Sequence, residues 1–175
     1  MNIRPYLLAV TVAVLPVAGM AASATFDVQS AANSTGGGSG FATGFILNTG
    51  DTFSWWTDVA DLWRLGSDPP PREGNADGLA VSDFGNHTHV DVSAPYGTLV
   101  GSIGGSFMAL GVSGTTTAWG NGELLLWNLD SNNSDNTGSI AVTISTPAVP
   151  LPAGLPLLVG GLAGLAALRR KKTSA

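Results

Sequence analysis

The chain has 175 residues, enough for one domain of ordinary size with additional segments on either side. It contains no cysteine, so any folded part must be stabilised by its apolar core, with or without a bound metal, and not by disulfides. All 12 Asp and Glu residues fall within residues 25–147, where Arg64 and Arg72 are the only cations; this net charge of −10 argues against a nucleic-acid partner.

The N-terminus has the pattern of a secretion signal. Arg4 precedes an apolar run over residues 6–17, and small residues follow at positions 21–24. We predict a signal peptide over residues 1–24, cut after Ala24. The alternative, an uncleaved anchor helix, is disfavoured because the run is short and Pro16 interrupts it.

The segment of residues 25–147 is rich in Gly, Thr, Ser, Asn and Asp and lacks long helical apolar periodicity, which favours extended structure. Turn residues separate seven strand candidates. These are residues 26–30, 41–47, 52–57, 98–103, 107–112, 123–128 and 139–145. The last alternates Ile140, Val142 and Ile144 with small residues, as expected of a half-buried strand. The sequence therefore predicts an all-β domain, a single antiparallel β-sandwich.

Two connections have distinctive compositions. Residues 36–40, Gly-Gly-Gly-Ser-Gly, have almost nothing to pack, so we expect a flexible loop. Residues 68–72 contain three consecutive prolines and should be stiff and extended. With the residues up to Pro95 they would form a long insertion between the two groups of strands, a common place for binding residues.

The segment before the last predicted strand is the most informative part of the sequence. Residues 128–136 contain two carboxylates, Asp130 and Asp135, together with several asparagines. Ca²⁺ prefers six to eight hard oxygen ligands, and such a loop can supply them. An Asx-rich hairpin turn has the same composition, so composition alone does not decide between the two. The spacing is not that of an EF-hand.

Two other groups of side chains deserve consideration. His87 and His89 would point to the same side of an extended strand and could bind zinc, but no third ligand is evident and a surface loop is the simpler interpretation. Among the tryptophans, Trp55 lies in a predicted strand and should be core, whereas Trp63 and Trp119 lie near loops and are better candidates for stacking on sugars. No nucleophile motif is present, so we do not expect an enzyme.

The C-terminus combines a hydrophobic run with a basic end. Residues 151–168 carry no charge and precede four cations. These are Arg169, Arg170, Lys171 and Lys172. The pattern predicts a transmembrane helix with a cytoplasmic basic stop, which would leave the domain outside the membrane.

The C-terminal residues also carry a short motif. The motif consists of Val149, Pro150, Leu151, Pro152 and Ala153. With the helix and basic end, residues 148–175 resemble the VPLPA-CTERM sorting signal. The resemblance implies recognition by an exosortase-type membrane enzyme that removes the helix, in a bacterial cell envelope. A plain membrane anchor is the alternative.

The predicted domain, in turn, resembles the PA-I-type galactophilic lectin family in four segments that follow in order. These are residues 44–51, 71–79, 96–104 and 130–139. The resemblance implies a galactose-binding-like jelly roll whose calcium ion bridges protein and sugar. By position it implies Ca²⁺ ligands at Asp130, Asn132, Asp135 and Asn136, of which the last two would also contact sugar. It places Asp77 where the family has a sugar-binding glutamine.

The chain departs from this family in ways that affect specificity. Its last loop is about two residues shorter, Asp135 replaces an asparagine, and the sugar-contacting histidine has no counterpart. The expected function is therefore a noncatalytic, calcium-assisted carbohydrate-binding protein of unassigned glycan. The rival expectation is a structural envelope or exopolysaccharide-matrix protein in which the loop is only a structural calcium site.

Overall fold

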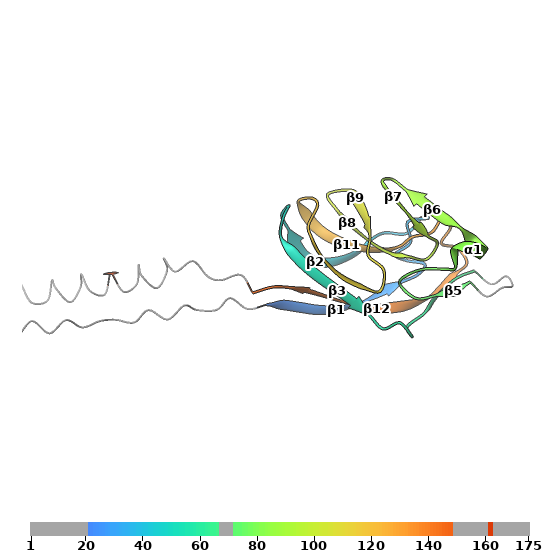
Figure 1. Ribbon diagram of the computed structural model, residues 1–175, viewed down its shortest axis with the longest axis horizontal. Helices are drawn as coiled ribbons and strands as arrows, with labels where there is room; N and C mark the ends of the chain where they lie inside the picture. The colour runs from blue at the N-terminus through green and yellow to red at the C-terminus, as the bar shows by residue number, and fades with distance from the viewer. Residues whose placement is uncertain (1–20, 67–71, 149–160, 163–175) are drawn as a thin grey trace, which may run out of the picture. The chain divides into compact units, whose positions relative to one another are not determined.

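The computed structural model describes residues 21–66, 72–148 and 161–162. Residues Ala21–Pro147 form a compact unit of their own, built from two main β-sheets (Figure 1). Of the expected signal peptide over residues 1–24, residues 1–20 lie outside the described residues, whereas Ala22, Ser23 and Ala24 belong to strand β1 (Ala22–Gln29). The sorting motif at residues 149–153, the basic stop at residues 169–172 and most of the proline-rich stretch also lie outside the described residues. Within the described residues, no helix has the length and apolarity needed to cross a membrane.

The larger sheet has six strands and is organised around one long central strand. In order across the sheet its strands are β10 (Ser113–Thr117), β3 (Thr52–Thr57), β12 (Asn136–Thr146), β4 (Trp63–Leu65) and β5 (Glu73–Gly74), with β1 (Ala22–Gln29) also paired to β12. Strand β12 pairs along one edge with β1 and along the other with β3 and then β4, always antiparallel. Between the segments paired to β3 and β4, the Asp61 carboxylate accepts a hydrogen bond from the Ala141 N–H at 2.7 Å.

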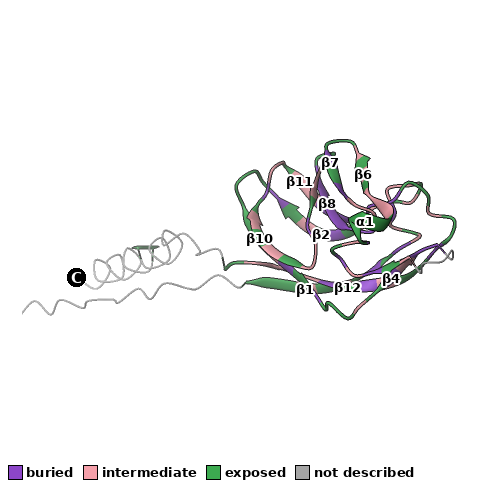
Figure 2. Ribbon diagram, turned by 45° about the vertical axis from the view of Figure 1, so that its right-hand side comes forward, coloured by how far each residue is buried: buried purple, intermediate pink, exposed green. Residues whose placement is uncertain are grey.

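The second sheet has four antiparallel strands, in the order β2 (Phe41–Leu47), β11 (Gly122–Asn128), β8 (Leu99–Ile103) and β9 (Ser106–Ala109). A hairpin of β6 (Asn86–His89) and β7 (Val92–Pro95) packs on its outer face. Val92 and Ala94 of the hairpin contact Val100 and Leu129 there, forming a second small core. Every residue of β8 is therefore buried, because both faces of that strand are covered (Figure 2).

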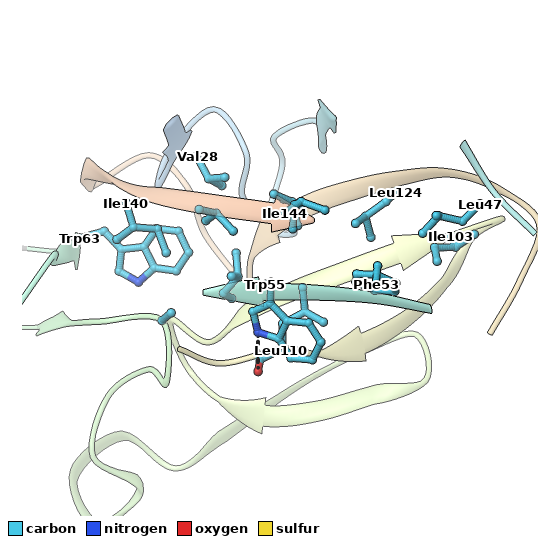
Figure 3. Close-up of a cluster of buried hydrophobic side chains, with 14 of the residues drawn as sticks. Val28, Leu47, Phe53, Trp55, Trp63, Ile103, Leu110, Leu124, Ile140 and Ile144 are labelled. Atoms are coloured by element: carbon cyan, nitrogen blue, oxygen red, sulfur yellow. Dashed lines mark hydrogen bonds between the residues drawn. The ribbon is translucent and has the colours of Figure 1, made fainter. Parts of the chain in front are cut away.

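The main core lies between the two sheets, which identifies the fold as an antiparallel β-sandwich. The six-stranded sheet contributes Phe53 and Trp55, and the four-stranded sheet contributes Leu124 and Ile103, all at most 7% exposed (Figure 3). The Trp55 indole N–H is satisfied by the Leu110 carbonyl at 3.2 Å. The all-β prediction is confirmed, since the single helix of the described domain, α1 (Val81–Phe84), has only four residues.

The seven strands predicted from the sequence are all present, three of them with starts or ends displaced by two residues or more. The alternation in β12 is confirmed, because Ile140, Val142 and Ile144 are fully buried. The strand predicted over residues 107–112 ends instead at Ala109. The sequence did not reveal β4, β5, β6, β7 or β10, because these strands are short or polar and offer no apolar alternation of useful length.

Substitution of the most central ring tests the sandwich. Phe53→Ala should lower the free energy of unfolding by about 3–5 kcal/mol, since a fully buried ring is replaced by a cavity. Ile46→Ala is the control: Ile46 is 69% exposed, so its loss should cost about 0.5 kcal/mol or less. Denaturant unfolding of residues 21–147 measures both. Equal losses for the two variants would contradict the core assignment.

Candidate functional site

The loop between β11 and β12 forms one side of a pocket of about 260 Å³. The loop supplies Asp130, Ser131, Asn132 and Asp135, which make this side polar. The other side is mostly apolar, and its residues come from parts of the chain between β4 and the residue directly after β7. Its residues are Leu65 of β4, Arg72, Leu79, Phe84 of α1, and Tyr96 directly after β7. The pocket therefore combines carboxylate and amide groups with an aromatic wall.

Asp130 is the most buried charged group of the pocket, with 6% of its surface exposed. Its Oδ1 accepts a hydrogen bond from the Ser131 N–H at 2.7 Å. Burial raises the pKa of Asp130 above its usual value, and the nearby Asp135 adds to this, whereas hydrogen bonds from the Asn136 side chain and from the Ser131 and Asn132 backbones oppose it. The ionised form of Asp130 is thus held where its charge is costly, which a cation would relieve.

Asn132 and Asp135 are joined to each other across the loop. The Asn132 amide donates from Nδ2 to Asp135 Oδ1 at 3.2 Å, and its Oδ1 accepts from the Ser134 N–H at 3.2 Å. Asp135 also lies against Gly66, where an added Cβ would come within 2.7 Å of Asp135 Oδ2. A glycine at position 66 therefore leaves room for the Asp135 carboxylate.

A buried polar cluster lies beneath the loop. Asn136, the first residue of β12, donates from Nδ2 to the Ser30 carbonyl at 3.2 Å, and Asn128 donates from Nδ2 to Ser30 Oγ at 2.5 Å. Within the described part of the chain, the Oδ1 atoms of both asparagines are buried without a hydrogen-bond partner. Because such an atom costs about 1–3 kcal/mol, each is expected to have a partner such as an ordered water or a bound ion.

The four residues predicted to bind calcium are brought together. Asp130, Asn132 and Asp135 line the pocket, and the Asn136 side chain contacts Asp130. No three His, Cys, Asp or Glu side chains among residues 21–66 and 72–148 gather closely enough to form a metal site. The predicted set has only two carboxylates and relies on amide and backbone oxygens for the rest, so calcium binding stays a prediction.

Asp77, predicted to contact sugar, does not line this pocket. Its Oδ1 accepts a hydrogen bond from the Val112 N–H at 2.9 Å, and its backbone forms an isolated bridge to Thr98. This side chain therefore serves the turn before β10, and its predicted contact with sugar stays untested.

The glycine-rich segment of residues 36–40, expected to be a flexible loop, is instead packed against the site. A Cβ at Gly36 would lie 2.4 Å from the Asn132 backbone nitrogen. Thr35 Oγ1, beside it, donates to the Asp130 carbonyl at 2.8 Å and accepts from the Asp130 N–H at 2.9 Å. The prediction was wrong because a missing side chain can allow close backbone contact as well as mobility. Nothing in the sequence pairs these two distant loops.

The two histidines lie on β6 with their rings on one side, as the alternation predicts. Each ring contacts an aromatic neighbour: His87 stacks on Tyr96 with centroids 5.0 Å apart, and His89 meets Phe107 edge-on at 4.8 Å. Burial lowers the pKa of His87, an effect that Asp130 opposes and His89 adds to. Among the described residues no group of three His, Cys, Asp or Glu side chains forms around them, and both rings pack on aromatic neighbours of the hairpin.

Not all of the tryptophans that pack in the core are the ones that the sequence predicted. Trp55 is core, as expected. Trp63, expected near a loop and available to sugar, is 1% exposed and donates from Nε1 to the Gly97 carbonyl at 2.9 Å. Trp119 packs on the core beside Phe53. The prediction for Trp63 was wrong because β4 is too short to be recognised from its sequence, although it pairs with β12 in the sheet.

The chain is similar to a solved lectin domain in fold only. No family model matches the chain, and no curated protein matches it. A solved chain described as "EclA N-terminal domain; PllA-like lectin" aligns with a TM-score of 0.46 and 19% sequence identity, covering 73% of this chain and 95% of that one.

The pH dependence of stability tests the environment of Asp130. Because its folded-state pKa lies above the unfolded value, protonated Asp130 favours the folded state; this stabilisation is complete below the unfolded pKa and disappears as pH rises through the folded-state pKa. With a chelator present, Asp130→Asn should therefore gain stability relative to the wild type as pH rises over that interval. Denaturant unfolding from pH 3 to about 7 measures the difference. A pH-independent difference, or the same trend in the exposed-site control Asp27→Asn, would contradict the assignment.

Packing between the two loops gives a second test. Gly36→Ala places a methyl group against the Asn132 backbone and should destabilise the domain by about 1–3 kcal/mol, as overpacking does. Ser39→Ala in the same segment is the control, since Ser39 is exposed and its hydrogen bonds, to the Ala32 carbonyl and from the Asn33 amide, use backbone atoms. Thermal unfolding compares the two. A Gly36→Ala domain as stable as Ser39→Ala would show that the segment is loosely packed after all.

Proposed function

We propose that the protein is an exported, noncatalytic, calcium-assisted carbohydrate-binding protein of the bacterial cell envelope. The observation that carries this proposal is the convergence of Asp130, Asn132 and Asp135 on one small pocket that also has the aromatic side chains Phe84 and Tyr96 in its wall. Binding pockets for small polar ligands typically combine a few directed polar groups with apolar and aromatic surface.

The donors of the loop fit a calcium ion. Ca²⁺ takes six to eight oxygens at roughly 2.3–2.6 Å, from carboxylates, amides and backbone carbonyls. Asp130 and Asp135 would supply the charged oxygens, and Asn132 and Asn136 neutral ones, including the buried Asn136 Oδ1 that has no partner among the described residues. The ion would supply a fixed positive charge and open coordination positions suited to vicinal sugar hydroxyls.

The remaining lining suits one sugar ring. Tyr96 and Phe84 offer aromatic surface for the apolar face of a pyranose, and the Asp135 carboxylate can accept hydrogen bonds from its hydroxyl groups. Asn136 could add a further polar contact. A small, open polar site of this kind binds a single sugar weakly, so many copies on one surface would be needed for avidity.

Binding without catalysis is proposed because of where the carboxylates lie. Glycoside hydrolysis needs two carboxyl groups on either side of the bond that is broken. Asp130 and Asp135 both come from one loop, and the other lining residues that the structure describes supply no carboxylate. We therefore assign these groups to holding a cation and orienting hydroxyls.

The direction of β12 supports display of the site away from the attachment point. The loop of Asp130 to Asp135 directly precedes Asn136, the first residue of β12, and the strand ends ten residues after Asn136, at Thr146. At roughly 3.3 Å per residue, the two ends of the strand are about 35 Å apart. The pocket loop and the residue at which β12 ends therefore lie at opposite ends of this strand.

The alternative is a structural envelope or matrix protein in which calcium only stabilises the fold. The observation that favours it is the tight coupling of the loop to the domain, through Thr35, Gly36 and the buried cluster of Ser30, Asn128 and Asn136. An ion in this place would hold the loop to the sandwich even if it never contacted a glycan.

Calcium and glycan titrations separate the two functions. At a Ca²⁺ concentration of 100 times its dissociation constant, residues 21–147 should gain about 2.7 kcal/mol of stability, and Asp130→Ala should abolish the gain. Asp27→Ala, at an exposed strand position, is the matched control and should behave like the wild type.

A glycan array probed with and without chelator decides between a carbohydrate-binding protein and a structural protein in which calcium only stabilises the fold. Binding that needs calcium and is lost in Asp130→Ala supports the lectin. A gain in stability with calcium but no glycan bound on the array identifies the structural role, and no calcium effect at all rejects both proposals.

A further inference from the structure

The outer face of the six-stranded sheet carries rows of hydroxyl side chains around one exposed tryptophan. Its members alternate along their strands with buried residues such as Trp55 and Ile144, so they project away from the core. We define the hydroxyl face as Trp56 with Thr25, Ser54, Ser113, Thr115, Thr143 and Ser145. Neither the core nor the pocket uses this surface.

Strand register places these side chains in two neighbouring rows. Across β1, β12, β3 and β10 the first row is Thr25, Thr143, Trp56 and Ser113, and the second contains Ser145, Ser54 and Thr115. Adjacent strands lie roughly 4.8 Å apart, which sets the spacing within a row. Two hydrogen bonds between hydroxyl groups hold the rows in place: Thr25 to Thr143 at 2.8 Å, and Ser54 to Ser145 at 2.9 Å. The hydroxyl groups are therefore regularly spaced and partly preordered.

Trp56 is unusual for its exposure. It is 57% exposed and is the only exposed aromatic side chain among residues 21–66 and 72–148. Its neighbour Trp55 is 7% exposed and is used by the core. An indole offers a broad apolar face and one N–H donor, the combination that is enriched in binding surfaces.

The hydroxyl face carries no charge, although the domain as a whole is strongly acidic. Charged groups begin at its borders, with Asp27 on β1 and Asp61, whose carboxylate accepts a hydrogen bond from the Ala141 N–H at 2.7 Å. The ion pair of Arg64 and Glu73 at 3.7 Å lies farther along β12, on β4 and β5. A negatively charged polymer would be repelled by the rest of the domain, and an uncharged one would not. The surrounding charge therefore disfavours an anionic occupant, and the face itself offers no carboxylate to bind a cationic one.

A protein partner fits this face poorly. The buried centre of a protein interface is about 65% apolar, whereas the hydroxyl face has a single large apolar side chain. The same reasoning applies to a second copy of this chain. A polymer that presents its own hydroxyl groups together with apolar ring faces matches both components of the surface.

We propose that the hydroxyl face is a second binding surface, for an extended uncharged polysaccharide. Trp56 stacks on the face of one sugar ring, and the serine and threonine hydroxyls exchange hydrogen bonds with the ring hydroxyls on either side. Because this surface contains no carboxylate, its binding does not need calcium. The domain would then hold a neutral matrix through the sheet while the pocket beside Asp130 takes a separate sugar.

The test uses the full chain in detergent micelles, sedimented with insoluble cellulose or chitin as uncharged probes. Trp56→Ser should weaken adsorption by about tenfold or more, as loss of a central aromatic anchor does. Ile46→Ser is the matched control: Ile46 is also exposed but lies on β2 of the other sheet, so adsorption should be unchanged. Added chelator should also leave adsorption unchanged, which separates this surface from the calcium pocket.

Three results would overturn the proposal. The first is adsorption of neither probe by the wild type, and the second is equal adsorption by Trp56→Ser and Ile46→Ser. The third is a wild-type dimer, seen by analytical ultracentrifugation, that Trp56→Ser dissociates, because a second copy of the chain would then occupy the face. Thermal unfolding of each variant confirms that a change in adsorption does not come from unfolding.

Discussion

Strand β12 is the element on which the rest of the domain depends. Its inward residues Ile140, Val142 and Ile144 are fully buried between the sheets, and its backbone pairs along both edges, with β1 on one side and β3 and β4 on the other. At one end it begins with Asn136, part of the candidate site, and its outward side chains form the middle of the hydroxyl face. Core, pocket and outer face are thus fixed relative to one another by a single strand.

The candidate site contains buried polar groups whose burial is energetically unfavourable, and a bound ligand would reduce that cost. Asp130 is nearly buried with a raised pKa, and Asn136 keeps a buried oxygen without a partner among the described residues. The loop cannot move away easily, since Thr35 holds both the N–H and the carbonyl of Asp130, and Gly36 contacts the Asn132 backbone. A preordered set of oxygen donors is what a calcium ion requires, whether the ion binds sugar or only stabilises the loop.

The two proposed binding surfaces use different physical principles. The pocket would bind through charge and coordination, and its affinity should depend on calcium. The hydroxyl face would bind through Trp56 and rows of neutral side chains spaced by the sheet. Under these two proposals, one domain would take a specific sugar at its end and a neutral polymer along its side.

The strands with regular apolar alternation could be predicted from the sequence because burial of one face of a sheet imposes a period of two. The same local chemistry predicted the acidic and amide loop of Asp130 to Asn136. Short strands such as β4 have too few residues to show a pattern, so the burial of Trp63 was not predicted. The packing of the glycine-rich segment against the Asp130 loop could not be predicted from the sequence either.

By itself, then, the sequence determined the all-β class, most strand positions and the residues of the candidate loop. Only the tertiary structure decided that Gly36 packs on that loop, that Tyr96 and Phe84 face it, that Asp77 does not, and that Trp56 is exposed among hydroxyl groups. The reason is that each of these contacts joins residues distant in the chain, and they depend on strand register and sheet packing, which local composition does not encode.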